Sequence, residues 1–458
     1  MLFNSFRFLF VFLPVVLLVY WLTPSLKARK YISVVSSYVF YGVWSYKFAL
    51  LMLATTSVDF FTARLLNDTQ SPRMRRLWLT LSMVSNLGVL GIFKYYDFFA
   101  SSLNALAPHA LLPLIHVALP IGISFYTFES MSYTIDVYKG KVPAIRHFID
   151  YAHFVTMFPR LVAGPIARYS DMTAQFHALP RWLPAADVAE AIHFFTVGLA
   201  KKVLLADYLA TKLVNPLWAN PHGLKFTTGW AAALSYTAQL YFDFSGYSDM
   251  AVGLALLLGF RLPRNFNLPY TSRSISEFWR RWHISLGSWL RDYLYIPLGG
   301  NRKGPWRKSL NLFLTMALGG LWHGANWTFV IWGCYHGIAQ VIENTLEGRM
   351  KPLPKWLAVG GTFLAVVVGW VLFRANSLGD ALLVLRAMIG LNGIGLAWVR
   401  ANLFRLVILA GALVVSITVD TYELKPALKL RWALAYGLIL TACITMFSAP
   451  SPFLYFQF

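Results

Sequence analysis

The sequence predicts an all-α polytopic membrane protein, and both its composition and its long charge-free runs point to this fold class. Of the 458 residues, 57% are hydrophobic and only 13% are charged, whereas soluble domains carry about 25% charged residues. A helix needs about 20 mainly apolar residues to cross the hydrocarbon core of a bilayer. The runs without Asp, Glu, Lys or Arg are Leu77–Phe93, Leu111–Phe128, Leu310–Ile342, Trp356–Leu372, Leu406–Val419 and Trp432–Phe458.

A further apolar stretch lies at the N-terminus, where Leu2–Trp21 has the length of a span and carries Arg7 near its start. A secretory signal is the rival interpretation of such a stretch. This one lacks a small-residue cleavage site, and further spans follow it. We therefore expect a retained first helix whose N-terminus lies outside.

Basic residues gather in the loops between apolar runs, as the positive-inside rule predicts for cytoplasmic loops. This pattern explains the net charge of +21, so we expect no nucleic-acid partner. Asp97–Val117, which has no Lys or Arg, and the short loop Asn215–Thr228 are expected to face outward. The clusters expected in the cytoplasm are Lys27, Arg29 and Lys30; Arg64, Arg73, Arg75 and Arg76; and Lys139, Lys141 and Arg146.

The longest basic stretch, Arg261–Lys308, combines cations with large aromatic rings, among them Trp279, Trp282 and Trp289. A solvated loop has little use for such rings, whereas Trp and Tyr favour the membrane boundary and Arg can extend its charged end to it. The segment therefore predicts a cytoplasmic interfacial or re-entrant helix.

Two glycine and proline breaks interrupt apolar sequence. Leu310–Ile342 is too long for one crossing, and Gly319, Gly320 and Gly324 lie near its middle. We predict a broken or hairpin pair of helices there. Irregular backbone at membrane depth is tolerated only where protein or a water-filled cavity shields it, so the break indicates a cavity. Phe158–Pro165 predicts a second re-entrant element.

His323 is the first candidate functional residue, because it lies in a charge-free run beside the glycine break and polar groups at membrane depth are expensive. Imidazole can take a proton from an attacking hydroxyl near neutral pH. From the residues alone, a hydrogen-bonded structural role is equally open. Asn326, expected one helical turn further on, is placed to orient the ring or a substrate carbonyl. On residue type alone, His283 and His336 are expected to be structural.

Two carboxylates, Asp243 and Asp249, form a polar island within an apolar helix. They are either proton carriers or structural partners of the basic segment, and we favour ion pairing because unpaired buried charge is costly. The two cysteines, Cys334 and Cys443, show neither metal-ligand spacing nor a disulfide pattern and are expected to be packing residues. No metal site is predicted.

Several motifs resemble those of the membrane-bound O-acyltransferase family, and of its alginate O-acetylation branch in particular. Leu119–Glu129, Phe158–Pro165, Val368–Arg374 and the closing Ser451–Phe458 also fit, so the resemblance covers nearly the whole chain. The motifs that carry it are Tyr241–Ala251 (YFDFSGYSDMA), Glu277–Leu286 (EFWRRWHISL), Trp289–Tyr295 (WLRDYLY), Leu298–Arg302 (LGGNR) and Gly319–Asn326 (GGLWHGAN).

The resemblance implies a single membrane domain over residues 1–458, with roughly 11–13 transmembrane or re-entrant helices around a central funnel. Its motif-rich catalytic core is expected at residues 239–346, including the basic segment 261–308. The histidine of the Trp-His-Gly motif, here His323, is implied to be catalytic, and His283 is implied as a second catalytic position. The residues expected to bind substrate are Asn326, Arg280, Arg281, Trp279 and Trp322.

The resemblance also implies a bacterial inner-membrane enzyme with no bound cofactor. It would take acetyl from acetyl-CoA in the cytoplasm and pass it to periplasmic acetyltransferase subunits of an exopolysaccharide complex. The linker Asp420–Arg431 is shorter than in alginate members, which leaves a cellulose-acetylation subunit equally possible. Two alternatives from other classes stay open: a non-catalytic transporter, since broken helices suit transporters too, and a scaffold of the polysaccharide complex.

Overall fold

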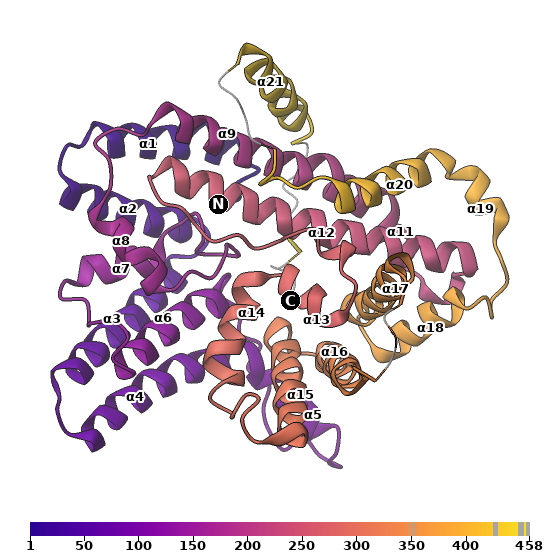
Figure 1. Cartoon of the computed structure of the whole chain (residues 1–458), viewed down its shortest axis with the longest axis horizontal. Coiled ribbons are helices and arrows are strands. Elements are labelled where there is room, and N and C mark those ends of the chain that lie inside the picture. Colours follow the sequence, from indigo (N-terminus) through magenta and orange to yellow (C-terminus); the bar gives the residue numbers. More distant parts are fainter. Residues whose placement is uncertain (347, 350, 352, 425–428, 448–452, 455–458) are drawn as a thin grey trace.

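The computed structural model describes residues 1–346, 348–349, 351, 353–424, 429–447 and 453–454. Within that part of the chain the regular elements are all helices (Figure 1). Helices satisfy their backbone hydrogen bonds internally, as a bilayer demands. The all-α prediction is confirmed. Three helical stretches of the described chain are long and apolar enough to cross a membrane: Tyr46–Asp68, Pro72–Asn104 and Lys355–Arg374.

Most helices of residues 1–177 lie on the left of Figure 1, whereas α5 appears at its lower centre. Local sequence sets their starts: Ser25 and Ser45 accept hydrogen bonds from backbone N–H groups in the first turns of α2 and α3, and Pro72 opens α4 at a position whose N–H needs no partner. The helices are α1 (Leu13–Leu22), α2 (Leu26–Gly42), α3 (Tyr46–Asp68), α4 (Pro72–Leu90), α5 (Tyr96–Asn104), α6 (Ile123–Tyr138), α7 (Phe148–Thr156) and α8 (Tyr169–His177).

The expected span Leu111–Phe128 is wrong in its first two thirds, because helix α6 begins only at Ile123. Two prolines and Gly122, whose φ is +78°, disfavour an earlier start. The non-helical backbone is satisfied by side chains instead. Asp97 accepts hydrogen bonds from the N–H groups of residues 115 and 116, and Asn104 accepts those of residues 111 and 112.

Two long helices, α9 and α12, lie side by side across the molecule (Figure 1). Their backbones approach closely at Gly198 and Gly246, where a Cβ atom on either residue would lie within 2.7 Å of the other residue's carbonyl oxygen. α12 is buried along nearly its whole length. The helices of this part are α9 (Ala185–Ala200), α10 (Asp207–Leu209), α11 (Asn215–Trp218) and α12 (Phe226–Leu257).

The two carboxylates on α12 form ion pairs, which confirms structural pairing, but their partners are lysines that follow α9 and not the arginines of the basic segment. Lys202 Nζ lies 2.6 Å from Asp243, and Lys201 Nζ lies 2.6 Å from Asp249. The backbone N–H of Leu454 also donates to Asp243. The prediction missed these lysines because two adjacent cations look like loop residues.

The basic segment contains two short α-helices, α13 and α14, and Trp282 and Trp289 lie in the protein core, whereas Trp306 is 79% exposed. Trp282 is 2% exposed and packs on Trp370, with ring centroids 4.9 Å apart. Trp289 stacks on Phe128 at 3.7 Å. The expectation that these two rings lie at the membrane boundary is therefore wrong. The C-terminal helices are α13 (Ile275–Arg281), α14 (Ile284–Leu290), α15 (Gly304–His323), α16 (Trp327–Leu346), α17 (Lys355–Arg374), α18 (Leu378–Met388), α19 (Leu396–Ala401), α20 (Leu403–Thr418) and α21 (Leu430–Thr445).

Most of the basic clusters expected in the cytoplasm lie near one another. The contacts that link them run between Lys30 and Asp150, from Arg64 to the carbonyl of Arg146, and from Arg75 to that of Tyr138. Lys139 and Arg168 lie over the ring of Tyr293, within the basic segment. This grouping agrees with a common side for these loops.

Arg29 departs from the pattern, because it is 1% exposed. Its guanidinium group donates to the backbone carbonyls of Thr23, Pro180 and Arg181 at 2.7–2.8 Å. It joins the end of the first helix to the segment before α9, and is a structural residue.

The second expected break is also present, since Phe158–Pro165 forms a fully buried turn without helix. Parts of the expected linker Asp420–Arg431, namely 425–428, and most of the closing motif lie outside the described residues. The cysteines are free, Cys443 buried and Cys334 half-buried, as expected for packing residues.

Candidate functional site

His323 is the last residue of α15. The helix ends there because Gly324 adopts an extended backbone, with φ of −160° and ψ of 146°. A Cβ atom at Gly324 would lie 2.2 Å from the ring of Phe329, so a side chain cannot be accommodated without moving that ring. The His323 side chain is 5% exposed. The glycine thus both stops the helix and fixes the imidazole at its end.

The predicted hairpin of broken helices is confirmed as α15 and α16. Of the three glycines, only Gly324 lies in the break, which covers residues 324–326. Gly319 and Gly320 are helical and serve packing instead. A Cβ atom at Gly320 would lie 2.3 Å from the carbonyl oxygen of Phe329, and one at Gly333 would lie 2.5 Å from that of Met316. These glycines let the two helices cross with their backbones in contact, next to His323.

Aromatic rings enclose the imidazole of His323. The ring centroids of Trp322, Trp332 and Phe373 lie 5.0, 5.2 and 5.5 Å from its own. They come from α15, α16 and α17, so three helices build one chamber. Burial in such surroundings excludes bulk water and strengthens any polar interaction within it.

His283 lies beside His323, with ring centroids 6.2 Å apart. It is 1% exposed and sits in the two-residue gap between α13 and α14. Its φ of +46° places it in the left-handed region, which non-glycine residues rarely occupy and which is often found at functional sites. The surrounding core holds this conformation, because Phe244 packs edge-on against the imidazole at 4.6 Å.

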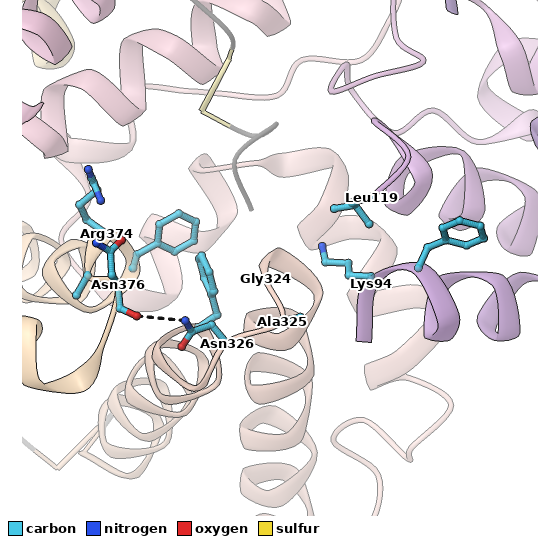
Figure 2. A pocket seen from close by; sticks show the side chains of 11 residues that line it. Lys94, Leu119, Gly324, Ala325, Asn326, Arg374 and Asn376 are labelled. Atoms are coloured by element: carbon cyan, nitrogen blue, oxygen red, sulfur yellow. Dashed lines mark hydrogen bonds between the residues drawn. The ribbon is translucent and has the colours of Figure 1, made fainter. Parts of the chain in front are cut away.

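A pocket of about 410 Å³ reaches the break next to His323. Figure 2 shows Lys94 and Leu119 on one wall, Arg374 and Asn376 on the other, and Gly324–Asn326 between them. An adjoining pocket of about 440 Å³ shares Ala325 and Asn326 with it. The remaining residues that line this second pocket are Asp97, Phe98, Ser101, Ser102, Leu114 and Trp327. The path thus runs toward the loop that the charge pattern places outside.

Asn326 lines both pockets, but the expected helical spacing to His323 is wrong, because residues 324–326 are not helical. Its side-chain oxygen accepts a hydrogen bond from the N–H of Thr328 at 3.0 Å, and its amide donates to the carbonyl of Asn376. Asn326 therefore starts α16 and ties it to the end of α17.

The other expected substrate-binding residues separate in the structure. Arg280 lines a different pocket of about 480 Å³, together with Ser274 and Glu343. Arg281 is engaged within its own helix, where it lies 2.7 Å from Glu277. Trp322 is part of the chamber around His323 and is 3% exposed.

Trp279 and His336 belong to the packing layer behind that chamber. Trp279 packs on Trp332 at 5.5 Å and on His336 at 5.2 Å. His336 is fully buried and its Nε2 atom abuts Gly369 of α17. The expectation that His336 packs against its neighbours is confirmed.

Lys94 is the residue at this site that the sequence analysis missed. It follows directly after the charge-free run Leu77–Phe93, and a lysine at the end of an apolar span is readily taken for an interfacial anchor. Its ammonium group instead donates to the carbonyl oxygens of Trp322 and His323. Among the residues that the structure describes, no group of His, Cys, Asp or Glu is arranged to hold a metal ion.

Comparison with known proteins shows which family the chain belongs to. Residues 92–377 match the model of the membrane-bound O-acyltransferase family. The probable alginate O-acetylase AlgI of Pseudomonas aeruginosa is 49% identical over 85% of this chain and 75% of its own. The peptidoglycan O-acetyltransferase of Helicobacter pylori is 39% identical over 86% and 81%, and the teichoic acid D-alanyltransferase of Bacillus subtilis is 28% identical over 64% and 77%. The polytopic membrane fold is thereby confirmed, and the chain belongs to the membrane-bound O-acyltransferase family and is an O-acyltransferase.

Proposed function

We propose that this chain is an inner-membrane O-acetyltransferase that takes acetyl from cytoplasmic acetyl-CoA and passes it outward for O-acetylation of an exopolysaccharide such as alginate or cellulose. The observation that carries the proposal is the position of His323, buried beside His283 and next to a pocket that runs toward the outward loop. The names of the alginate and peptidoglycan relatives support acetyl as the group and a polysaccharide as its destination.

His323 acts as the general base in this proposal. An acceptor hydroxyl enters through the pocket at Gly324–Asn326, and His323 takes its proton as the oxygen attacks the thioester carbonyl. The carbon–sulfur bond breaks, the acetyl ester forms, and the proton passes to the departing CoA thiolate. His283 is the second catalytic residue. The closed aromatic chamber limits hydrolysis of the thioester by water.

The donor reaches this chamber from the side of the basic segment. Arg280 faces a pocket of about 480 Å³ there, and a guanidinium group is well suited to the phosphates of CoA. Arg281 supports that side through its ion pair with Glu277. Trp279 and Trp322 support it by packing. Periplasmic acetyltransferase subunits of the exopolysaccharide complex are the partners that this direction of transfer requires.

The test is CoA release from labelled acetyl-CoA by the purified protein in lipid vesicles. Wild type is compared with His323→Ala, His283→Ala and His153→Ala. His153 is a matched control, because it is equally buried but packs against Phe176 and Phe260, away from the site. We expect release that is lost in His323→Ala and kept in His153→Ala. Full release by His323→Ala would overturn the base assignment.

A transporter or a scaffold would consume no acetyl-CoA under any condition. If wild type alone releases no CoA, periplasmic subunits or short exopolysaccharide chains are added as acceptors. Release that appears only with an acceptor supports the proposal and identifies that acceptor. Continued absence of turnover, with acetyl-CoA intact, contradicts it in favour of the non-catalytic alternatives.

A further inference from the structure

The end of α15 is held by two consecutive residues of a distant helix. Lys94 Nζ donates to the carbonyl oxygen of Trp322 at 2.5 Å and to that of His323 at 3.2 Å. The hydroxyl group of Tyr95 donates to the carbonyl of Leu321 at 3.1 Å. Three successive carbonyls, the last of them that of His323 itself, therefore depend on one dipeptide more than 200 residues earlier in the chain.

These carbonyls need external donors. The last four C=O groups of an α-helix have no partner within the helix, and α15 ends inside the protein, where Trp322 and His323 are buried. The C-terminus of a helix also carries partial negative charge, which a cation stabilises. The ammonium group of Lys94 meets both needs, and it also lies 5.8 Å from the ring of Trp322.

A local distortion supports this contact. Gly91–Tyr95 forms a short π-helix, η2, between α4 and α5. One-turn π-helices are rare, and they are frequently found at functional sites. An α-helix turns about 100° per residue, so neighbouring side chains normally point in different directions, yet both Lys94 and Tyr95 reach the end of α15.

We propose that Lys94 is a positioning residue for acyl transfer, whose ammonium group fixes the last turn of α15 and so holds the imidazole of His323 in place beside Gly324, which lines the pocket. The inference rests on the proposed function of His323. Lys94 is not assigned to the substrate, because its donors are already directed to the two carbonyls and to Ser124 Oγ at 3.4 Å.

Loss of the Lys94 ammonium group should lower the rate of acyl transfer more than the stability of the protein. Without the ammonium group, the carbonyls of Trp322 and His323 lose their donor, and the imidazole is free to shift. Misplacement of a catalytic group by about 1 Å can reduce a rate on the order of 100-fold. The donor pocket at Arg280 lies on other elements, so acetyl-CoA binding should be unaffected.

The experiment measures kcat and KM for acetyl-CoA, and the thermal midpoint, of the full-length protein in lipid. The variants are Lys94→Ala, Lys94→Arg and Lys212→Ala. Lys212 is a matched control, since it is an exposed lysine in another π-helix, Ala210–Val214. We expect kcat of Lys94→Ala to fall about 100-fold with an unchanged KM, Lys94→Arg to recover part of it, and Lys212→Ala to match wild type.

Chemical rescue separates positioning from general support of the fold. Alanine at position 94 leaves a space the size of propylammonium next to the pocket of about 410 Å³. Added propylammonium should restore kcat, whereas tetramethylammonium, which has no N–H to donate, should not. The proposal is overturned if Lys94→Ala keeps full kcat while wild type is active, or if its loss follows a lower thermal midpoint and resists rescue. A wild type that stays inactive even with added acceptors would instead contradict the proposed function.

Discussion

The imidazole rings of His283 and His323 lie 6.2 Å apart between centroids, although His283 lies in the gap between α13 and α14 and His323 is the last residue of α15. Neither ring lies in open solvent, and both share Trp322 as a neighbour. Two titratable groups this close together within an aromatic chamber support the proposed acid–base site.

The left-handed backbone of His283 allows its conformational role to be tested separately from its chemical role. Asparagine tolerates φ above zero better than most residues, so His283→Asn should keep the thermal midpoint while removing the imidazole. We expect acyl transfer to fall about 100-fold, within the usual contribution of a general acid or base. Thermal unfolding and CoA release measure the two effects. Retained activity in this folded variant would show that the imidazole is dispensable.

The contact of α15 with α16 depends on Gly320. A Cβ atom there meets the carbonyl oxygen of Phe329 at 2.3 Å, so Gly320→Ala should force the helices apart and destabilise the protein by about 1–3 kcal/mol. Gly360→Ala in α17 is the matched control, because nothing lies within 4 Å of its Cβ position. The control should be neutral or slightly stabilising. Equal thermal midpoints for the two variants would contradict close packing at Gly320.

The buried pair Lys202–Asp243 should be structural. Removing only one carboxylate, as in Asp243→Leu, leaves the buried Lys202 cation still paired with Asp207 at 2.8 Å, so the destabilisation should be smaller than the roughly 3–5 kcal/mol expected for a buried charge without a partner. Adding Lys202→Met to that variant should recover part of the loss. A double-mutant cycle on the unfolding free energy measures the coupling. CoA release per folded molecule should stay unchanged, and a selective loss of activity would revive the proton-carrier interpretation.

Arg29 should stabilise the protein through the geometry of its guanidinium group and not through its charge alone. Its guanidinium group serves three carbonyls, a geometry that lysine cannot reproduce. Arg29→Lys should therefore lower the thermal midpoint, even though the charge is kept. Lys27→Ala, at an exposed position nearby, should have no effect. Stability of Arg29→Lys equal to that of wild type would mean that the carbonyls find other donors.

Much of the fold could be predicted from short stretches of the sequence. Apolar runs located most helices, and the glycines predicted the α15–α16 hairpin, because helix length and backbone freedom are properties of short stretches. The same signals failed at Leu111–Phe128, where hydrophobicity outweighed two prolines in the assignment. They also failed for the rings of the basic segment, because Trp282 and Trp289 look the same in sequence whether they face lipid or a protein core.

The site was predicted only in part for a related reason. His323 stood out by being polar in an apolar run, and the family resemblance added His283. The spacing between His323 and Asn326 was misjudged because periodicity assumes a continuous helix. Lys94 acts through backbone carbonyls, and backbone contacts leave no pattern in side-chain sequence.

The aromatic enclosure of His323 has a consequence for the membrane as a barrier. A reaction chamber reachable by water from both sides would also conduct protons and other ions, and the cell would lose part of its electrical gradient through every copy of the enzyme. The imidazole of His323, which is the proposed catalytic base, is enclosed by three rings at 5.0–5.5 Å. These rings belong to Trp322, Trp332 and Phe373. If His323 carries out the proposed chemistry, the same rings would also prevent ions from leaking across the membrane.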